Sequence, residues 1–236
     1  MLSLHGLSSS INVFVVNEMQ REDYEPIVIP MADHPRSACW RDEDTIVVTE
    51  HLQLSQFYIG AGGEVNAFNR VNVGTNDITC VCSFQSNDNI VACTATDRGV
   101  FGLNSRNLKI VKRWRAPIRN TVVGSVSGRM HCSALKMDVD VVFMCGDDNE
   151  VLMYNYSARE EKEGALKERH TINIRSRSRI IGLTLVSVGN IPYLAVLGQN
   201  GDLDLIRNPC DFMMERRKRK VTGGVEMDEK RMMMDE

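Results

Sequence analysis

The feature that most restricts the fold is a short pattern that occurs three times: an apolar stretch, a tight polar turn and a second apolar stretch. The three copies cover residues 89–103, 140–154 and 191–206, and their turns fall at Asp97, Asp148 and Asn200. These turns are 51 and then 52 residues apart. A hairpin that returns at a nearly fixed interval is the signature of a repeat array, so we expect a repetitive all-β fold. Such arrays usually bind other macromolecules, and the chain carries no catalytic motif.

Strands are predicted wherever a run of β-branched or aromatic residues is bounded by Gly, Asn or Asp. These runs group into four units. The predicted strands are residues 37–40, 45–49, 54–59 and 65–73; residues 77–84, 90–94, 99–103 and 108–114; residues 130–135, 141–145, 150–156 and about 169–174; and residues 179–186, 193–197 and 202–207. Two further β-like runs precede them, at residues 11–16 and 26–29. The pair Asn200-Gly201 predicts a type I′ turn, because both residues tolerate a positive φ. Gly60-Ala-Gly-Gly63 predicts another hairpin turn.

Polarity rises from the first to the last strand of a unit, as it does across one blade of a propeller. Over residues 34–207 the chain resembles the WD-repeat-like β-propellers. The resemblance implies an all-β, propeller-like array of about four to five four-stranded antiparallel blades. The Gly-His pair and the Trp-Asp dipeptide of that family are missing. The pairs that stand where the dipeptide would be are Leu103-Asn104, Tyr156-Ser157 and Arg207-Asn208.

The chain divides into three regions: N-terminal strands (1–33), blade repeats (34–208) and a tail (209–236). Four units are fewer than the usual seven, each of which takes roughly 40–45 residues. In one alternative, residues 11–16 or 26–29 supply the missing strand of the fourth unit and close a small ring. In the other, the chain forms an open part of a propeller whose exposed faces are covered by a partner or by further sequence. The tail is predicted to be disordered or a short helix.

Composition excludes several classes of function. With 43% hydrophobic and 25% charged residues, the chain can build a soluble core. Its net charge of -3 argues against a generally basic nucleic-acid binder. No apolar run reaches the roughly 18 residues that a membrane span needs, and residues 1–16 do not read as a secretory signal. We therefore expect no membrane contact and no secretion.

The seven cysteines form an odd-numbered set, which indicates free thiols in the reducing nucleus or cytoplasm. Cys80 and Cys82 would lie on one face of a strand, as small core residues. No cysteine pair has the spacing of a structural zinc site. We expect no metal, no cofactor, no small-molecule substrate and no enzymatic activity.

Polar turns and basic segments are the candidate contact residues. The candidates for partner binding are Asp97, Arg98, Asp148, Asn149, Arg175, Arg177 and Arg179. The three arginines alternate with serines and, together with Lys112, Arg113, Arg115 and Arg119, would form a basic rim. Five consecutive cations in the tail indicate nuclear import or a nucleic-acid contact, with a solubilising tail as the alternative. These cations are Arg216, Arg217, Lys218, Arg219 and Lys220.

From these observations we expect a non-catalytic scaffold for protein–protein interaction, a subunit of a larger multiprotein complex in the nucleus or cytoplasm. The alternative is a nucleic-acid-associated factor that binds RNA or chromatin through the basic tail and the arginine-rich rim. A salt titration separates the two hypotheses, because binding to phosphates weakens steeply as salt is added.

Overall fold

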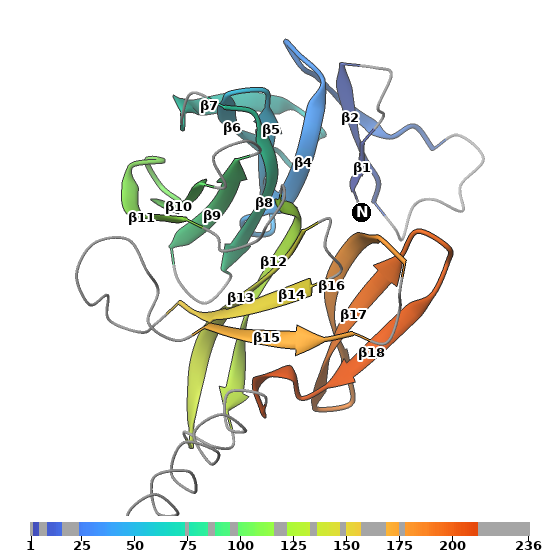
Figure 1. Cartoon of the computed structure of the whole chain (residues 1–236). Helices are drawn as coiled ribbons and strands as arrows, with labels where there is room; N and C mark the ends of the chain where they lie inside the picture. The colour runs from blue at the N-terminus through green and yellow to red at the C-terminus, as the bar shows by residue number, and fades with distance from the viewer. Residues whose placement is uncertain are drawn as a thin grey trace, which may run out of the picture.

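In the computed structural model, the chain forms five antiparallel sheets that follow one another along the sequence (Figure 1). The structure describes residues 2–4, 9–15, 24–73, 76–84, 88–94, 99–115, 122–132, 136–146, 150–156, 169–174 and 178–211. We name the sheets A to E in chain order. The predicted all-β, propeller-like array of antiparallel blades is confirmed.

Within every sheet the strands are neighbours in the order in which they occur in the chain. Sheet A contains β1 (Leu2–Leu4), β2 (Ser10–Val13) and β3 (Ile27–Pro30). Sheet B contains β4 (Pro35–Trp40), β5 (Thr45–Glu50), β6 (Gln53–Ile59) and β7 (Val65–Asn72). Sheet C contains β8 (Ile78–Phe84), β9 (Asn89–Thr94), β10 (Gly99–Asn104) and β11 (Ile110–Arg115). Sheet D contains β12 (Val122–Cys132), β13 (Met137–Gly146), β14 (Glu150–Asn155) and β15 (Arg169–Asn173). Sheet E contains β16 (Ile180–Val188), β17 (Ile191–Gly198) and β18 (Leu203–Arg207), and a short 3-10 helix, η2 (Pro209–Asp211), follows it.

The first strands of sheets B to E form the inside of the array. β4 lies beside β8, β8 beside β12, and β12 beside β16. The last strands of sheets B, C and D lie at the other edge of their sheets, away from this inner row (Figure 1). Each sheet therefore runs outward from a common centre, as a propeller blade does.

Hydrophobic side chains fill the space between consecutive sheets. In β5, Val47 packs toward sheet C, whereas Ile46 and Val48 pack toward sheet A. Successive residues of a strand point to opposite faces, so a strand between two neighbouring sheets is buried on both sides. All six residues of β5 are buried for this reason. Such strands appear in the sequence as continuous apolar runs rather than alternating ones.

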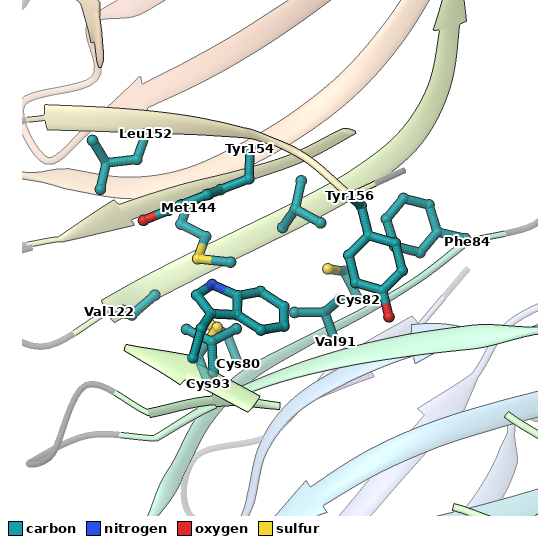
Figure 2. Packing of buried hydrophobic residues seen from close by; sticks show 13 residues of the cluster. Cys80, Cys82, Phe84, Val91, Cys93, Val122, Met144, Leu152, Tyr154 and Tyr156 are labelled. Atoms are coloured by element: carbon teal, nitrogen blue, oxygen red, sulfur yellow. The ribbon is translucent and has the colours of Figure 1, made fainter. Parts of the chain in front are cut away.

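Four clusters connect the five sheets in sequence, A to B, B to C, C to D and D to E. The cluster between sheets C and D holds more aromatic rings than any other cluster, namely Phe84, Trp114, Tyr154 and Tyr156 (Figure 2). The ring of Tyr156 lies 4.8 Å from that of Phe84 and 6.2 Å from that of Trp114, centre to centre. Cys80, Cys82 and Cys93 belong to the same cluster, so these cysteines are core residues, as the sequence indicated.

One predicted strand is placed wrongly. The sequence places the first strand of the third unit at residues 130–135, whereas β12 spans Val122–Cys132. Its first half, Val-Val-Gly-Ser-Val-Ser-Gly-Arg, is rich in glycine and serine, which have low strand propensity. The segment is nevertheless a strand because it pairs along β13 and because small side chains fit where the inner strands converge.

Of the two alternatives for the ends of the array, closure by an N-terminal strand does not occur in the described residues. Residues 11–16 and 26–29 do not complete the fourth unit, because β2 and β3 pair with each other, with Ile11 opposite Ile29. Ile11, Val13 and Ile29 pack against sheet B, which gives these side chains a buried environment that an outer strand of sheet E would not offer. Sheet E remains three-stranded in the described part of the chain.

The two predicted turns are present, but one has a different geometry. The nitrogen of Gly63 donates to the oxygen of Gly60, which closes the turn between β6 and β7. Between β17 and β18, Gly201 N donates to Gly198 O at 3.0 Å, and only Gly201 has a positive φ (89°). A type I′ turn would need a positive φ at both central residues. The loop is instead a turn over residues 198–201 whose last residue is a left-handed glycine.

Candidate interaction surface

A groove lies where the inner strands of sheets B to E meet. Its volume is about 830 Å³, and β4, β8, β12 and β16 all contribute to its walls. The residues that give it polar and aromatic character are Trp40, Ser83, Ser125, Ser127, Arg129, Thr184 and Ser187. Because the walls come from four different sheets, the shape of the groove depends on how those sheets are held together.

Serine hydroxyls hold the inner strands in place. The hydroxyl of Ser83 on β8 donates to the carbonyl of Trp40 on β4. The hydroxyl of Ser127 on β12 then donates to the carbonyl of Ser83 at 2.8 Å, and Ser37 on β4 accepts from the backbone nitrogen of Val81 at 3.2 Å. Inner strands of different sheets cannot form a continuous backbone ladder, so these bonds satisfy backbone groups that the groove would otherwise leave unpaired.

The far wall of the groove is more open. Arg129, Thr184 and Ser187 are exposed. The Nε of Arg129 lies 3.8 Å from a carboxylate oxygen of Asp138, and Nδ1 of His131 lies 3.1 Å from the other oxygen. All three side chains are more than half exposed, so water weakens the attraction between Arg129 and Asp138. The Arg129 guanidinium can therefore exchange Asp138 for a carboxylate or carbonyl of a bound molecule.

The thiols beside the groove are poor nucleophiles. Burial raises the pKa of the Cys82 thiol to about 12. Burial and the nearby Cys82 raise the pKa of Cys39 well above its usual range. Only the thiolate attacks carbon or sulfur centres, and both groups are protonated thiols at neutral pH. These cysteines contribute packing to the groove wall.

Most of the sequence-predicted contact residues lie outside the described residues. These are Asp97, Arg98, Asp148, Asn149, Arg175 and Arg177, together with residues 216–220 of the tail. Arg179 is described: it is exposed and immediately precedes β16, and its carbonyl accepts from Gln199 N at 2.8 Å.

The predicted basic rim is not assembled by the described residues. Lys112 and Arg113 belong to β11, the outer strand of sheet C, whereas Arg179 precedes the inner strand of sheet E. Lys112 donates to the carbonyl of Tyr156 at 3.0 Å and lies 4.4 Å from the centre of its ring. Arg113 lies over the ring of Phe101, at 5.0 Å. These two cations bind aromatic residues of the protein itself.

The groove residues were missed by the sequence reasoning, although a signal for them exists. The first strand of each unit contains a serine with at least one small or apolar neighbour, as at Ser37, Ser83, Ser127 and Ser187. A hydroxyl that returns in the same strand of successive repeats indicates a shared structural position. The polar turns were more conspicuous than this pattern.

Comparison with known proteins identifies the fold and no family. No family model matches the chain, and no curated protein matches it. Among solved structures, the chain is similar to a crystal structure of BBS1N in complex with ARL6DN, soaked with mercury, with a TM-score of 0.59 and 13% sequence identity. The match covers 89% of this chain and 62% of that one, so this chain spans less than two thirds of its length. At this identity the similarity shows the fold alone.

Two further features are absent from the described ranges. No group of three or more His, Cys, Asp or Glu side chains is arranged there to hold a metal ion. No helix in the same ranges has the length and apolar character needed to cross a membrane.

Proposed function

We propose that this protein is a non-catalytic scaffold that binds partner proteins through the groove between its inner strands. We further propose that it is a divergent WD-repeat-like propeller and a subunit of a larger assembly. The observation that supports the proposal best is the groove itself. Three of its four walls, β4, β8 and β12, are joined to one another by hydroxyl–carbonyl hydrogen bonds. A rigid site loses little conformational entropy when it binds.

The chemistry of the groove suits an extended polypeptide segment. Hydroxyl groups such as those of Thr184 and Ser187 can both donate to and accept from peptide groups. Trp40 offers a large flat surface, and Arg129 can hold a carboxylate. Phosphate-driven nucleic-acid binding would require several cations along the groove, and Arg129 is the only one on its walls in the described residues.

The solved structures are consistent with a role in protein binding. BBS1N, which shares the fold, was crystallised in complex with ARL6DN. We extend to this chain only the general idea that such an array presents a rigid surface to another protein. The affinity purification described next is designed to identify the partner of this chain.

The test compares affinity purifications of the full chain and two charge-reversal variants. Arg129→Glu alters the groove, whereas Lys109→Glu alters an exposed cation next to β11, on another part of the molecule. Quantitative mass spectrometry measures the amount of each protein that co-purifies with the unaltered chain. We expect this amount to fall at least tenfold with Arg129→Glu and to stay unchanged with Lys109→Glu. Recovery of the same proteins at the same level with Arg129→Glu would contradict the proposal.

Salt dependence provides a second measurement on any partner recovered in this way. We expect binding to change by less than about tenfold between 50 and 200 mM salt, because few charges take part. A phosphate-dominated contact would lose about 10³-fold or more over that range. A loss of that size would favour the nucleic-acid alternative.

A further inference from the structure

Two cysteines face each other across the first two strands of sheet C. Cys80 on β8 is the register partner of Cys93 on β9. Residues opposite each other in an antiparallel pair have Cα atoms about 4.5 or 5.5 Å apart, and both values lie within the roughly 4.4–6.8 Å that a disulfide spans. Both side chains belong to the cluster between sheets C and D, where Figure 2 shows them side by side. A disulfide can therefore form here without a change of strand register.

The other cysteines of the chain have no cysteine opposite them in the described strands. Cys39 is opposite Val47, Cys82 is opposite Val91, Cys132 is opposite Met137, and Cys145 is opposite Gly124 and Val151. Cys210 lies in η2 rather than in a strand. Cys82 is the useful comparison, because it belongs to the same cluster as Cys80 and lies on the same strand.

The surroundings of Cys80 favour its thiolate. The Cys93 thiol donates a hydrogen bond to the Cys80 sulfur, which lowers the pKa of Cys80 and raises that of Cys93. The hydroxyl of Thr79 lies 3.9 Å from the Cys80 sulfur. The buried hydroxyl oxygen of Ser125 has no hydrogen-bond partner among the described residues, and a thiolate at Cys80 gives it one. Because the thiolate is the form that reacts, Cys80 is the nucleophile of the pair.

We propose that Cys80 and Cys93 are a site of reversible disulfide formation, with hydrogen peroxide as the oxidant. The Cys80 sulfur attacks one oxygen of the peroxide and breaks the O–O bond, which leaves a sulfenic acid on Cys80 and releases one water. The Cys93 sulfur then attacks the Cys80 sulfur, the S–O bond breaks, and the departing hydroxide takes the Cys93 proton to form a second water. The two thiols give up two electrons and two protons, and peroxide is reduced to water. A dithiol reductant reverses the change by thiol–disulfide exchange.

A break in the strand pairing lies beside this site. The register of β8 and β9 shifts between Ile78 and Cys80, so Thr79 has no register partner on β9. Such a bulge interrupts the ladder of backbone hydrogen bonds, and Cys93 is next to the last residue of β9. Cys80 is 4% exposed and Cys93 0%, so peroxide reaches them when this end of the hairpin opens briefly. We therefore expect oxidation over minutes to hours rather than seconds.

Peptide mapping of the full chain tests this inference. The chain is treated with hydrogen peroxide, the remaining thiols are blocked with N-ethylmaleimide in denaturant, and the chain is cut after Phe84 for mass spectrometry. The cut separates Cys80 from Cys93, so their disulfide joins two peptides, and fragmentation distinguishes Cys80 from Cys82. We expect the joined peptides to contain the Cys80–Cys93 bond and dithiothreitol to restore both free thiols.

Three single variants identify the sulfurs that react. The yield of joined peptides should fall at least tenfold in Cys80→Ala and in Cys93→Ala, because each removes one of the two reacting sulfurs. Cys82→Ala is the matched control on the same strand, and the yield should change there by less than about twofold, because the Cys82 thiol stays protonated. Circular dichroism establishes that each variant is folded.

The unaltered chain decides the outcome even where a variant does not fold. Absence of a Cys80–Cys93 disulfide after peroxide treatment would overturn the inference, as would a loss of yield in Cys82→Ala equal to that in Cys80→Ala. The chain unfolded in urea and oxidised in the same way should form the Cys82–Cys93 bond as readily as the Cys80–Cys93 bond. The same preference for Cys80 in the unfolded chain would contradict selection by strand register. Trp40 and Arg129 of the groove take no part, so failure here leaves the proposed scaffold function unaffected.

Discussion

At the scale of single residues, Gly102 shows how closely sheets C and D are packed. A Cβ atom at this position would lie 2.5 Å from the hydroxyl oxygen of Tyr156 and 3.1 Å from Cβ of Lys112. Tyr156 is buried and its ring is held by Phe84 and Trp114, so it has little room to move. We expect Gly102→Ala to lower the free energy of unfolding by about 1–3 kcal/mol, as overpacked cores do. Urea denaturation measures the change.

The matched control is Gly182→Ala in sheet E. The nearest atom to an added Cβ there is Cβ of Leu197 at 3.8 Å, an ordinary contact distance. Its effect on the free energy of unfolding should remain within about 0.5 kcal/mol. Equal losses for the two variants would show that Tyr156 does not limit the space at Gly102.

The buried thiols predict how stability depends on pH. Burial raises the pKa of Cys82, and also that of Cys210, to about 12 from the ordinary thiol value of 9.0. In the unfolded chain these thiols lose their protons near pH 9, whereas in the folded chain they keep them until about pH 12. Their stabilising contribution is therefore complete below about pH 9 and decreases as the pH rises toward 12, by up to about 1.4 kcal/mol per pH unit for each thiol.

Urea denaturation between pH 8 and pH 10.5 tests this prediction. The unaltered chain should lose stability steadily above about pH 9. The variant Cys82→Ala is expected to be less stable at pH 8 but to have a shallower decrease at higher pH. If the free energy of unfolding decreases with pH as steeply in Cys82→Ala as in the unaltered chain, this thiol has the same pKa in the folded and unfolded states.

At the scale of secondary-structure elements, the inner strands depend on the hydroxyls that join them. Removing the hydroxyl in Ser127→Ala leaves the carbonyl of Ser83 without its donor from β12. We expect a loss of about 1 kcal/mol in the free energy of unfolding, the usual value for one hydrogen bond. Ser187→Ala, at an exposed site in the same groove, should cost less than about 0.5 kcal/mol. The reverse order would indicate that the hydroxyl of Ser127 does not stabilise the contact between β8 and β12.

The elements that could be predicted from sequence are those with a strong local pattern. β9, β10 and β14 combine β-branched side chains with polar turns, and their predicted and observed positions agree closely. The first half of β12 could not be predicted, because its glycines and serines favour a strand only once neighbouring inner strands surround it. The turn at Gly201 shows the same limit: local residues specify that a turn forms, whereas the register of β17 and β18 selects its type.

At the scale of the whole molecule, the sequence predicted that similar sheets repeat along the chain, but it did not predict how the array ends at its first and last sheets. The place of Ile11 and Ile29 depends on contacts with Ile46 and Val48, residues far along the chain, and no local pattern encodes that choice. The groove was missed for a related reason, since Trp40, Ser127 and Ser187 come together only when sheets B to E are stacked.

Cellular distribution remains a prediction of the sequence, and residues 216–220 lie outside the described residues. We propose that this Arg-Arg-Lys-Arg-Lys segment mediates nuclear import. Deleting it from a fluorescently labelled chain should lower the ratio of nuclear to cytoplasmic signal several-fold. A deletion of residues 229–233, in the same tail, is the control. An unchanged ratio after deletion of residues 216–220 would support the role of a solubilising tail.

The order of the four hydrophobic clusters along the chain determines which sheets unfold first. Sheets B, C and D each share two clusters with neighbours, whereas sheets A and E each share only one. Stability in such a linear stack is a sum of nearest-neighbour contributions, so opening begins at the two ends and progresses inward. Backbone amides of sheet C should exchange hydrogen most slowly, and those of sheets A and E should exchange through partial openings that leave the middle intact.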